Sequence, residues 1–207
     1  MKNLKNDAVL GLLFGKWVYA VLIGFFLMLI VQPLSAQKRL SFELRGAANA
    51  AIQDLGDAKL ETGIGIEGTI AYRFMEHLSI YGGWSWNHFA SGESFAGTNI
   101  DFEETGYSFG LRFIHPIGTS NLSYLVGGGG LYNHIEAENE AGDIIADTGH
   151  GLGWQLDAGI VIPIGESLRI TPGIRYRALS REFQIDAFKT PVDLNYLSAG
   201  LGISWLF

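Results

Sequence analysis

The feature that most restricts the fold of this chain of 207 residues is a regular alternation of apolar residues with small or polar ones. It is clearest in the closing stretch LSAGLGISWLF, residues 197–207. Successive side chains of a strand point to opposite faces, so the odd-numbered positions from Leu197 to Phe207 share one apolar face. Chain ends usually fray into water, and an apolar end therefore needs a dry environment. The pattern predicts a strand whose two faces meet different surroundings.

The same alternation recurs along the chain and predicts eight strands, at 39–47, 63–74, 78–87, 106–114, 122–132, 152–164, 168–178 and 197–207. Three of the connections, near 75–77, 116–120 and 165–167, are short enough to be tight turns. The other four, near 49–61, 88–101, 135–149 and 181–192, are longer and more polar. An even number of strands with short turns at one rim and long loops at the other is typical of a transmembrane β-barrel.

The aromatic residues favour a barrel over a water-soluble β-sandwich, whose core would have to bury nearly all of them. Two interfacial belts are predicted, because aromatic side chains concentrate at both membrane surfaces. The belt near the short turns comprises Tyr72, Phe74, Phe113, Tyr124, Trp205 and Phe207, and the belt near the long loops comprises Trp84, Trp86, Tyr107, Tyr132 and Trp154. Hydrocarbon excludes open sheet edges, so the first and last strands are expected to pair. We predict an all-β fold, a closed antiparallel eight-stranded up-and-down β-barrel.

Composition narrows the functional classes. Charged residues make up 17% of the chain, against roughly a quarter in an average soluble domain. There is no cysteine, so disulfides, thiolate chemistry and a lipid-bearing cysteine are all excluded. The net charge of −7 argues against nucleic acid as a partner, because phosphate binding needs a basic surface.

Residues 1–36 have the pattern of a cleavable export signal. Lys2, Lys5 and Lys16 precede an apolar run at 17–31, and QPLSA leads to a predicted cut between Ala36 and Gln37. A retained membrane anchor is the alternative, but the run of 15 residues is shorter than the ~20 that a spanning helix needs. We predict a signal peptide at 1–36 and one barrel domain at 37–207.

With its signal, its amphipathic strands and its terminal SWLF, the segment from Arg39 to Phe207 resembles the eight-stranded outer membrane barrels of the OmpX-like and OmpA-transmembrane-domain-like families. The resemblance implies a multi-pass location in the outer membrane of a Gram-negative-type cell, with outer membrane lipid and lipopolysaccharide as partners, and a monomer. It also implies that the outer-membrane assembly machinery recognises the end of the last strand, here Leu201, Ile203, Trp205 and Phe207.

The inward face of the predicted barrel carries many charges. An eight-stranded barrel is just wide enough for side chains to fill it, and buried charges are costly unless they are paired. We therefore predict an ion-pair network that plugs the lumen, formed by Glu43, Arg45, Glu67, Arg73, Arg112, Asp157, Arg169, Arg175 and Arg177, with Glu104 as a further candidate. A continuous water pore is the alternative.

Pro163 and Pro172 fall in adjacent predicted strands, and each removes a hydrogen-bond donor from the sheet. A weakened seam of this kind could admit apolar molecules sideways. A bulge or local bend without transport is the interpretation that we favour.

Several motifs suggest chemistry without supporting it. The stretch GIGIEG (63–68) matches a dinucleotide-binding fingerprint but lies inside one strand pattern, without the helix that the fingerprint needs. No His-rich metal-binding spacing occurs, and His88 with Ser91 or His134 with Glu136 imitates the catalytic groups of the lipid A deacylases only loosely. The acidic segment 135–149 could bind divalent cations, but a solvated acidic loop is the interpretation that we favour. We predict no catalytic residues, no metal and no cofactor.

The function predicted from the sequence is a non-enzymatic outer membrane barrel with a structural or surface-contact role, which can reach an extracellular ligand through its long loops. A small channel or transporter for apolar or small solutes is the second hypothesis, and a lipid A-modifying enzyme is the third. Fold alone does not decide among them.

Overall fold

The computed structural model describes residues 38–185 and 188–207, so the predicted signal peptide lies outside the described residues. The strands are β1 (Leu40–Ala51), β2 (Gly63–Arg73), β3 (Leu78–Ser94), β4 (Gly97–Pro116), β5 (Ser123–Glu138), β6 (Ile144–Asp147), β7 (Gly151–Ile164), β8 (Leu168–Ile185) and β9 (Phe188–Leu206). The described residues contain no helix that is long and apolar enough to cross a bilayer.

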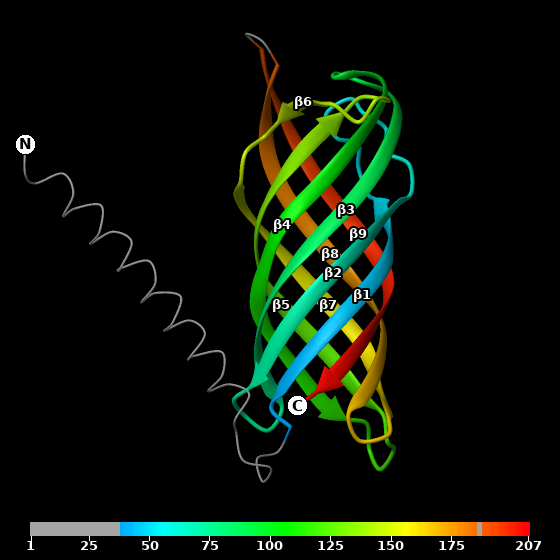
Figure 1. Cartoon of the computed structure of the whole chain (residues 1–207), viewed down its shortest axis with the longest axis vertical. Helices are drawn as coiled ribbons and strands as arrows, with labels where there is room; N and C mark the ends of the chain where they lie inside the picture. The colour runs from blue at the N-terminus through cyan, green and yellow to red at the C-terminus, as the bar shows by residue number, and fades with distance from the viewer. Residues whose placement is uncertain (1–37, 186–187) are drawn as a thin grey trace, which may run out of the picture. The chain divides into compact units, whose positions relative to one another are not determined.

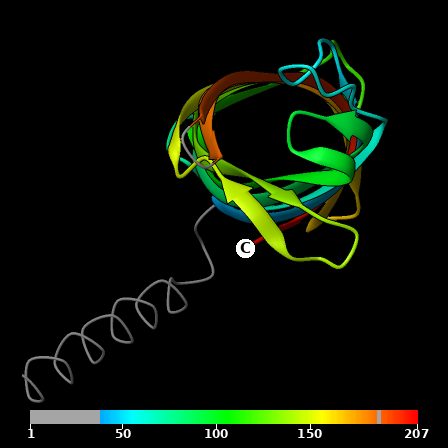
Figure 2. The same cartoon turned by 90° about the horizontal axis from the view of Figure 1, so that it is seen from above.

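Eight of the strands form a closed antiparallel ring, which confirms the predicted fold (Figures 1 and 2). Each ring strand pairs with the next along the chain, β5 pairs with β7, and β1 pairs with β9 from Ser41↔Leu206 to Ala51↔Tyr196. The short strand β6 lies outside the ring and pairs only with the end of β5. The short turns and the chain end at Phe207 lie at one end of the barrel, the short-turn end (Figure 1). The long hairpins rise at the other, the hairpin end.

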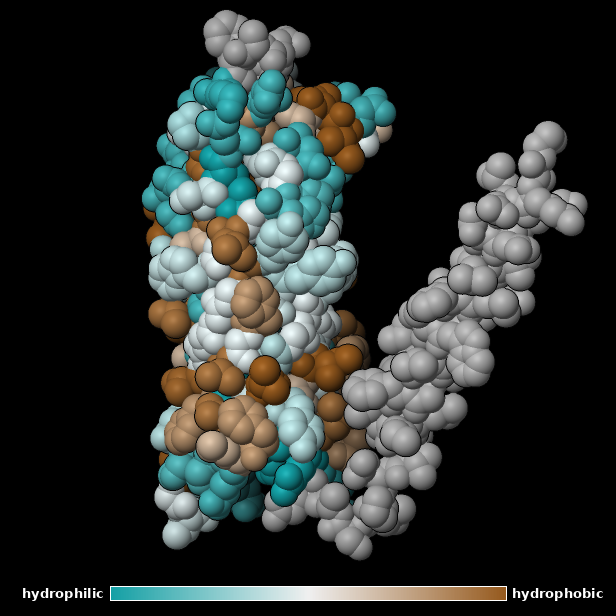
Figure 3. Space-filling model, turned by 90° about the vertical axis from the view of Figure 1, so that its left-hand side faces the viewer, coloured by the Kyte–Doolittle hydropathy of each residue, from teal (hydrophilic) through white to brown (hydrophobic). Residues whose placement is uncertain are grey.

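Alternation along each strand sorts the side chains between lipid and lumen. The outward residues of β2 are exposed and apolar, with Ile64 60%, Ile66 51% and Ile70 58% exposed, whereas the inward Glu67 is only 4% exposed. On the face drawn in Figure 3, hydrophobic and neutral side chains cover the middle and lower part, and hydrophilic ones gather towards the two ends. A surface with this much exposed apolar area between polar ends requires a lipid solvent.

Two of the connections predicted as long loops, 88–101 and 181–192, are largely strand. β3 runs on to Ser94 before β4 begins at Gly97, and β8 runs on to Ile185 before β9 begins at Phe188. The alternation continues there with its polarity reversed. Phe89, Phe102 and Phe183 point inward and are completely buried. Beyond the lipid the outside of the barrel meets water, so these strands place polar residues outside and apolar ones inside.

The reversed alternation builds an apolar layer inside the hairpin end. Its buried members are Leu55, Ala58, Phe89, Ile100, Phe102, Leu131, Ile135, Ala137, Ala146, Leu179, Phe183, Val192, Leu194 and Tyr196. Leu55 and Ala58 reach it from the connection between β1 and β2, where their backbones exchange hydrogen bonds of 2.9 and 3.0 Å. Phe95, at the tip between β3 and β4, packs with its ring centroid 5.4 Å from that of Phe183. Both connections therefore help to fill the barrel interior.

The ladder between β7 and β8 is interrupted beside Pro172. Pairing runs from Gly153↔Leu179 to Gly159↔Gly173 and resumes at Ile162↔Ile170 in the same register. The two intervening pairs are lost where Pro172 has no N–H to donate. Pro163 keeps its place opposite Arg169. Pro172 therefore breaks the ladder locally, and Pro163 does not.

Candidate functional site in the barrel lumen

Arg177 on β8 is the centre of the polar lumen. Its guanidinium forms an ion pair with Glu67 of β2 and lies 3.3 Å from Glu104 of β4. It also donates hydrogen bonds to three neutral oxygens, at Gln155 (2.9 Å), Ser85 (2.9 Å) and Tyr196 (3.2 Å). Only 2% of the residue is exposed. Arg177 thus joins five other ring strands through one side chain.

Arg112 on β4 forms a second centre closer to the short-turn end. Its Nη1 donates to Glu43 of β1 at 3.2 Å, and its Nε lies 3.5 Å from Asp157 of β7. Glu67 is 3.9 Å from its Nη2, which links this centre to the one around Arg177. The Arg112 guanidinium also stands 4.7 Å from the ring centroid of Tyr81, a cation–π geometry.

Glu104 on β4 lies where the polar lumen meets the apolar layer of the hairpin end, and it is fully buried. It accepts hydrogen bonds from Asn87 (2.6 Å) and Tyr196 (2.8 Å), and a further one from Asn133. Charge-assisted bonds of this kind are the strongest that side chains form. Since these donors come from β3, β9 and β5, the carboxylate ties three more parts of the ring together.

The charges of this lumen network balance. Its cations are Arg45, Arg112, Arg175 and Arg177, and its anions are Glu43, Glu67, Glu104 and Asp157. Arg175 pairs with Glu67 at 2.7 Å, while Arg45 donates to the carbonyl of Gly173 at 2.8 Å. Four positive groups therefore face four negative ones, and the neutral partners Ser85, Asn133 and Tyr196 extend the network to all eight ring strands. The structure brings together seven of the nine residues predicted for the plug and adds Glu104.

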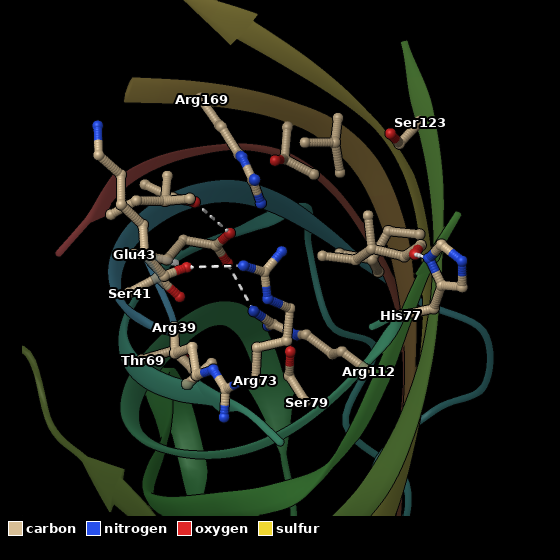
Figure 4. Close-up of a pocket in the computed structure, with 18 of the residues that line it drawn as sticks. Arg39, Ser41, Glu43, Thr69, Arg73, His77, Ser79, Arg112, Ser123 and Arg169 are labelled. Carbon is tan, nitrogen blue, oxygen red and sulfur yellow. Dashed lines mark hydrogen bonds and ion pairs between the residues drawn. The ribbon is translucent and has the colours of Figure 1, made fainter. Parts of the chain in front are cut away.

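The other two predicted residues, Arg73 and Arg169, lie apart from the network, near the short-turn end. They border a cavity of about 310 Å³ that lies inside the ring at that end (Figure 4). The cavity touches the network only through Glu43 and Arg112. Sequence patterns missed it, because the alternation shows that a residue points inward but not whether its neighbours fill the space.

The aromatic residues of the two predicted belts lie on the outside of the barrel. Near the hairpin end, Trp84 pairs with Tyr107, and Tyr107 with Tyr132, so these three rings stand at one height on adjacent strands. The Trp86 ring N–H donates to Glu103 at 2.6 Å. At the short-turn end, Trp205 stacks on Phe42 with ring centroids 6.4 Å apart. The remaining members of the assembly motif, Leu201, Ile203 and Phe207, are also outward and exposed.

Histidines and carboxylates gather on the outside of β3 to β6, beyond the belt. His88 lies 3.3 Å from Asp101, and the side chains of His134, Glu136 and Asp147 converge within 4.8 Å. Ser91 does not join His88, because it is buried on the inward face and donates to the Glu93 carbonyl. The structure therefore does not assemble the serine–histidine pair considered from the sequence.

The comparisons with known proteins agree with this architecture. The model of the family described as "Outer membrane protein beta-barrel domain" matches residues 21–207. Among solved structures, the outer membrane protein OprG from Pseudomonas aeruginosa is similar with a TM-score of 0.56 at 15% identity, over 84% of this chain and 99% of OprG. Outer Membrane Protein W of E. coli gives 0.53 at 13% identity, over 83% of this chain and 100% of the other.

Neisserial surface protein A gives a TM-score of 0.53 at 13% identity, over 79% of this chain and 94% of that protein. No curated protein sequence matches significantly. Identities this low indicate the shared fold alone. The family match, which spans most of the sequence, places the protein in the outer membrane, with the short-turn end on the periplasmic side. The chain belongs to the family of outer membrane protein β-barrel domains.

Proposed function

We propose that the protein is a non-enzymatic barrel with a sealed lumen, and that it acts through the surface it presents outside the cell. The observation that carries this proposal is the lumen network, to which every ring strand contributes a buried polar side chain. Above it lies the apolar layer, completely buried at Phe89, Phe102 and Phe183. A solute crossing the barrel would have to break paired buried charges and then displace packed aromatic rings.

Conductance measurements test whether the lumen is closed to ions. The mature protein, folded in detergent and inserted into planar bilayers, is expected to give no current steps of reproducible size. Folding is checked first by the change in gel mobility on boiling, since closed barrels resist detergent. Reproducible unitary steps from the folded protein would contradict the proposal and favour a pore.

The surface role is tested in cells that lack the protein. Wild-type chain and a variant whose β3–β4 tip, residues 92–98, is replaced by a tight turn are expressed at equal levels. If the hairpins carry the function, the shortened variant folds but does not restore the envelope or attachment defect of the deletion strain. Full restoration by the shortened variant would argue for a role of the membrane-embedded barrel alone.

Lipopolysaccharide and outer membrane lipid, which surround a single barrel, are the partners we propose for its outer face.

One observation favours the second candidate, a route for apolar solutes. The ladder between β7 and β8 is interrupted at Pro172, close to the short-turn end. If solutes pass there, Pro172→Val restores a donor and reduces the uptake of an apolar dye into cells, whereas Pro163→Val, at a position that keeps its pairing, does not. Equal uptake by wild type, both variants and cells without the protein would remove this candidate.

A further inference from the structure

The cavity at the periplasmic end is enclosed by the whole ring. Residues of all eight ring strands line it, from Ser41 on β1 round to Ser204 on β9. Its volume, about 310 Å³, lies at the lower end of the range of small-molecule sites. Figure 4 shows Arg169 reaching into the opening from β8, with Glu43 and Arg112 forming the floor. An occupant would therefore sit directly beneath the lumen network.

The walls of this cavity carry an excess of positive charge. Glu43 and Arg112 belong to the balanced network, which leaves Lys38, Arg39, Arg73 and Arg169 against the single carboxylate of Glu76. The Glu76 side chain is 88% exposed and lies near His77 instead. Four cations and one carboxylate leave three positive charges in excess, in a protein whose net charge is −7.

Arg73 and Arg169 face this cavity with few partners of their own. Among the described residues neither has a carboxylate within 4.0 Å. The one side-chain hydrogen bond of Arg73 goes to the carbonyl of Lys38, at 3.1 Å. This contrasts with Arg112 and Arg177, each of which contacts at least two carboxylates.

The opposite wall is apolar. It is formed by Ile114, Leu125 and Val161, and the last two are only 5% and 4% exposed. Next to these groups water is partly excluded, so an electrostatic contact made in the cavity is stronger than one on an open surface. Hydroxyl groups of Ser79, Ser123 and Thr171 add neutral hydrogen-bonding partners. The cavity thus combines a cationic side, an apolar side and several hydroxyls.

We propose that this cavity binds a small oxyanion of phosphate chemistry, held by Arg73 and Arg169. A guanidinium presents paired N–H donors that match two oxygens of a phosphate group, which a lysine cannot do. The phosphate can belong to a free periplasmic phosphate compound or to the headgroup of a lipid in the inner leaflet of the outer membrane. In either case the bound group neutralises positive charge for which the described residues supply no carboxylate within 4.0 Å.

Titration calorimetry with inorganic pyrophosphate tests the site in the mature protein folded in a zwitterionic detergent. We expect saturable binding by the wild type. Arg73→Gln with Arg169→Gln removes two charge-assisted donors and is expected to weaken binding roughly tenfold or more. The matched control is Lys59→Gln with Lys189→Gln, which removes the same charge from exposed positions on the other end of the barrel.

Unchanged binding by the control and weakened binding by the arginine variant support the site. No saturable binding by the wild type, or equal weakening in both variants, overturns it. Gel mobility before boiling establishes that each variant is folded. Should Arg73→Gln with Arg169→Gln fail to fold, Arg73→Lys with Arg169→Lys keeps the charge and removes the paired donors, and a similar loss of affinity is then expected.

A second arm identifies the source of the phosphate. Pyrophosphate is titrated into two proteins, the wild type and the control Lys59→Gln with Lys189→Gln. Each is measured in nanodiscs of phosphatidylcholine and again in nanodiscs that contain phosphatidylglycerol. A lipid headgroup in the cavity competes, so the affinity of both proteins for pyrophosphate falls in the anionic discs, and a co-purifying phospholipid is lost from the arginine variant. Equal affinities in the two kinds of disc assign the site to a free phosphate compound.

Discussion

Arg177 and Glu104 meet across the lumen, Nη1 to Oε2 at 3.3 Å, although their strands β8 and β4 are not neighbours in the ring. Each also holds further buried partners, Glu67 for the arginine and Asn87 for the carboxylate. The cross-section of the barrel is therefore fixed by side chains as well as by the backbone ladder.

Removing the central cation should strongly destabilise the barrel. Arg177→Met leaves the buried Glu104 with no cation within 4.0 Å among the described residues, and we expect the free energy of unfolding to fall by about 3–5 kcal/mol. Urea titration in detergent, followed by gel mobility, measures the change. Lys189→Met is the control, because its pair with Glu182 is exposed and contributes little to stability. Similar losses in both variants would show that the network adds little.

Packing beside the network is expected to be sensitive as well, but to a smaller degree. A Cβ on Gly127 would lie 2.5 Å from Asp157 Oδ1 and 3.1 Å from Arg112 Cγ. Gly127→Val should therefore displace both side chains and destabilise the barrel by about 1–3 kcal/mol. Gly46→Val provides a matched control, because a Cβ there meets nothing within 4 Å. Unfolding by urea compares the two, and equal stability would mean that the network shifts without cost.

The terminal aromatic residue should matter more for assembly in cells than for folding in detergent. Phe207 is 67% exposed on the outside of the barrel and makes a backbone hydrogen bond to Leu40 that a serine can keep. We expect Phe207→Ser to lower the folded fraction in the outer membrane several-fold while refolding in detergent changes little. Fractionation followed by gel mobility measures the first, and refolding yield the second. Met75→Ser, another exposed apolar residue at the short-turn end, controls for lost hydrophobicity.

Glu138, on the part of β5 that pairs with β4 beyond the aromatic belt, should bind its proton more tightly than an ordinary glutamate. Partial burial and the nearby carboxylates of Glu103 and Glu136 raise the pKa of Glu138 above its ordinary value. A raised pKa means that the folded state holds the proton more tightly than the unfolded chain. The contribution of Glu138 to stability is thus fully present below its unfolded pKa and is lost as the pH rises through its folded pKa.

Carbon-13 NMR of the labelled side-chain carboxyl groups measures this shift. The Glu138 midpoint is expected to fall towards the ordinary glutamate value when Glu103→Gln and Glu136→Gln are combined. An unchanged Glu138 midpoint in the double variant would refute the coupling.

Local pattern was sufficient to predict the ring. A period of two residues with one apolar face specifies a strand at each of the eight places, and lipid then requires closure. The hairpins were missed because the polarity reverses. Residues such as His88 and Glu103 are outward and polar, while Phe89 and Phe102 are inward and apolar. The alternation continues into these hairpins. The position at which the apolar face changes from outward to inward marks the edge of the hydrocarbon.

The residues of the lumen network could be predicted from the sequence, but the ion pairs that they form could not. Inward arginines and acids follow from the alternation, yet whether Arg175 or Arg169 meets Glu67 depends on the stagger of strands around the ring. Here Arg175 lies 2.7 Å from Glu67, and Arg169 faces the cavity instead. Stagger is set in part by pairings such as Arg45↔Gly202, which join distant parts of the chain and which no single segment encodes.

The buried layer around Phe89, Phe102 and Phe183 gives the hairpin end and the membrane-embedded part of this barrel different responses to temperature. Outside the lipid, packing depends on expelling water from apolar surface, a driving force that weakens on cooling. Within the bilayer the outward apolar groups stay in hydrocarbon whether or not neighbouring strands separate. Cooling should therefore loosen the packing within the extracellular hairpins, while the strand segments within the bilayer keep their stability.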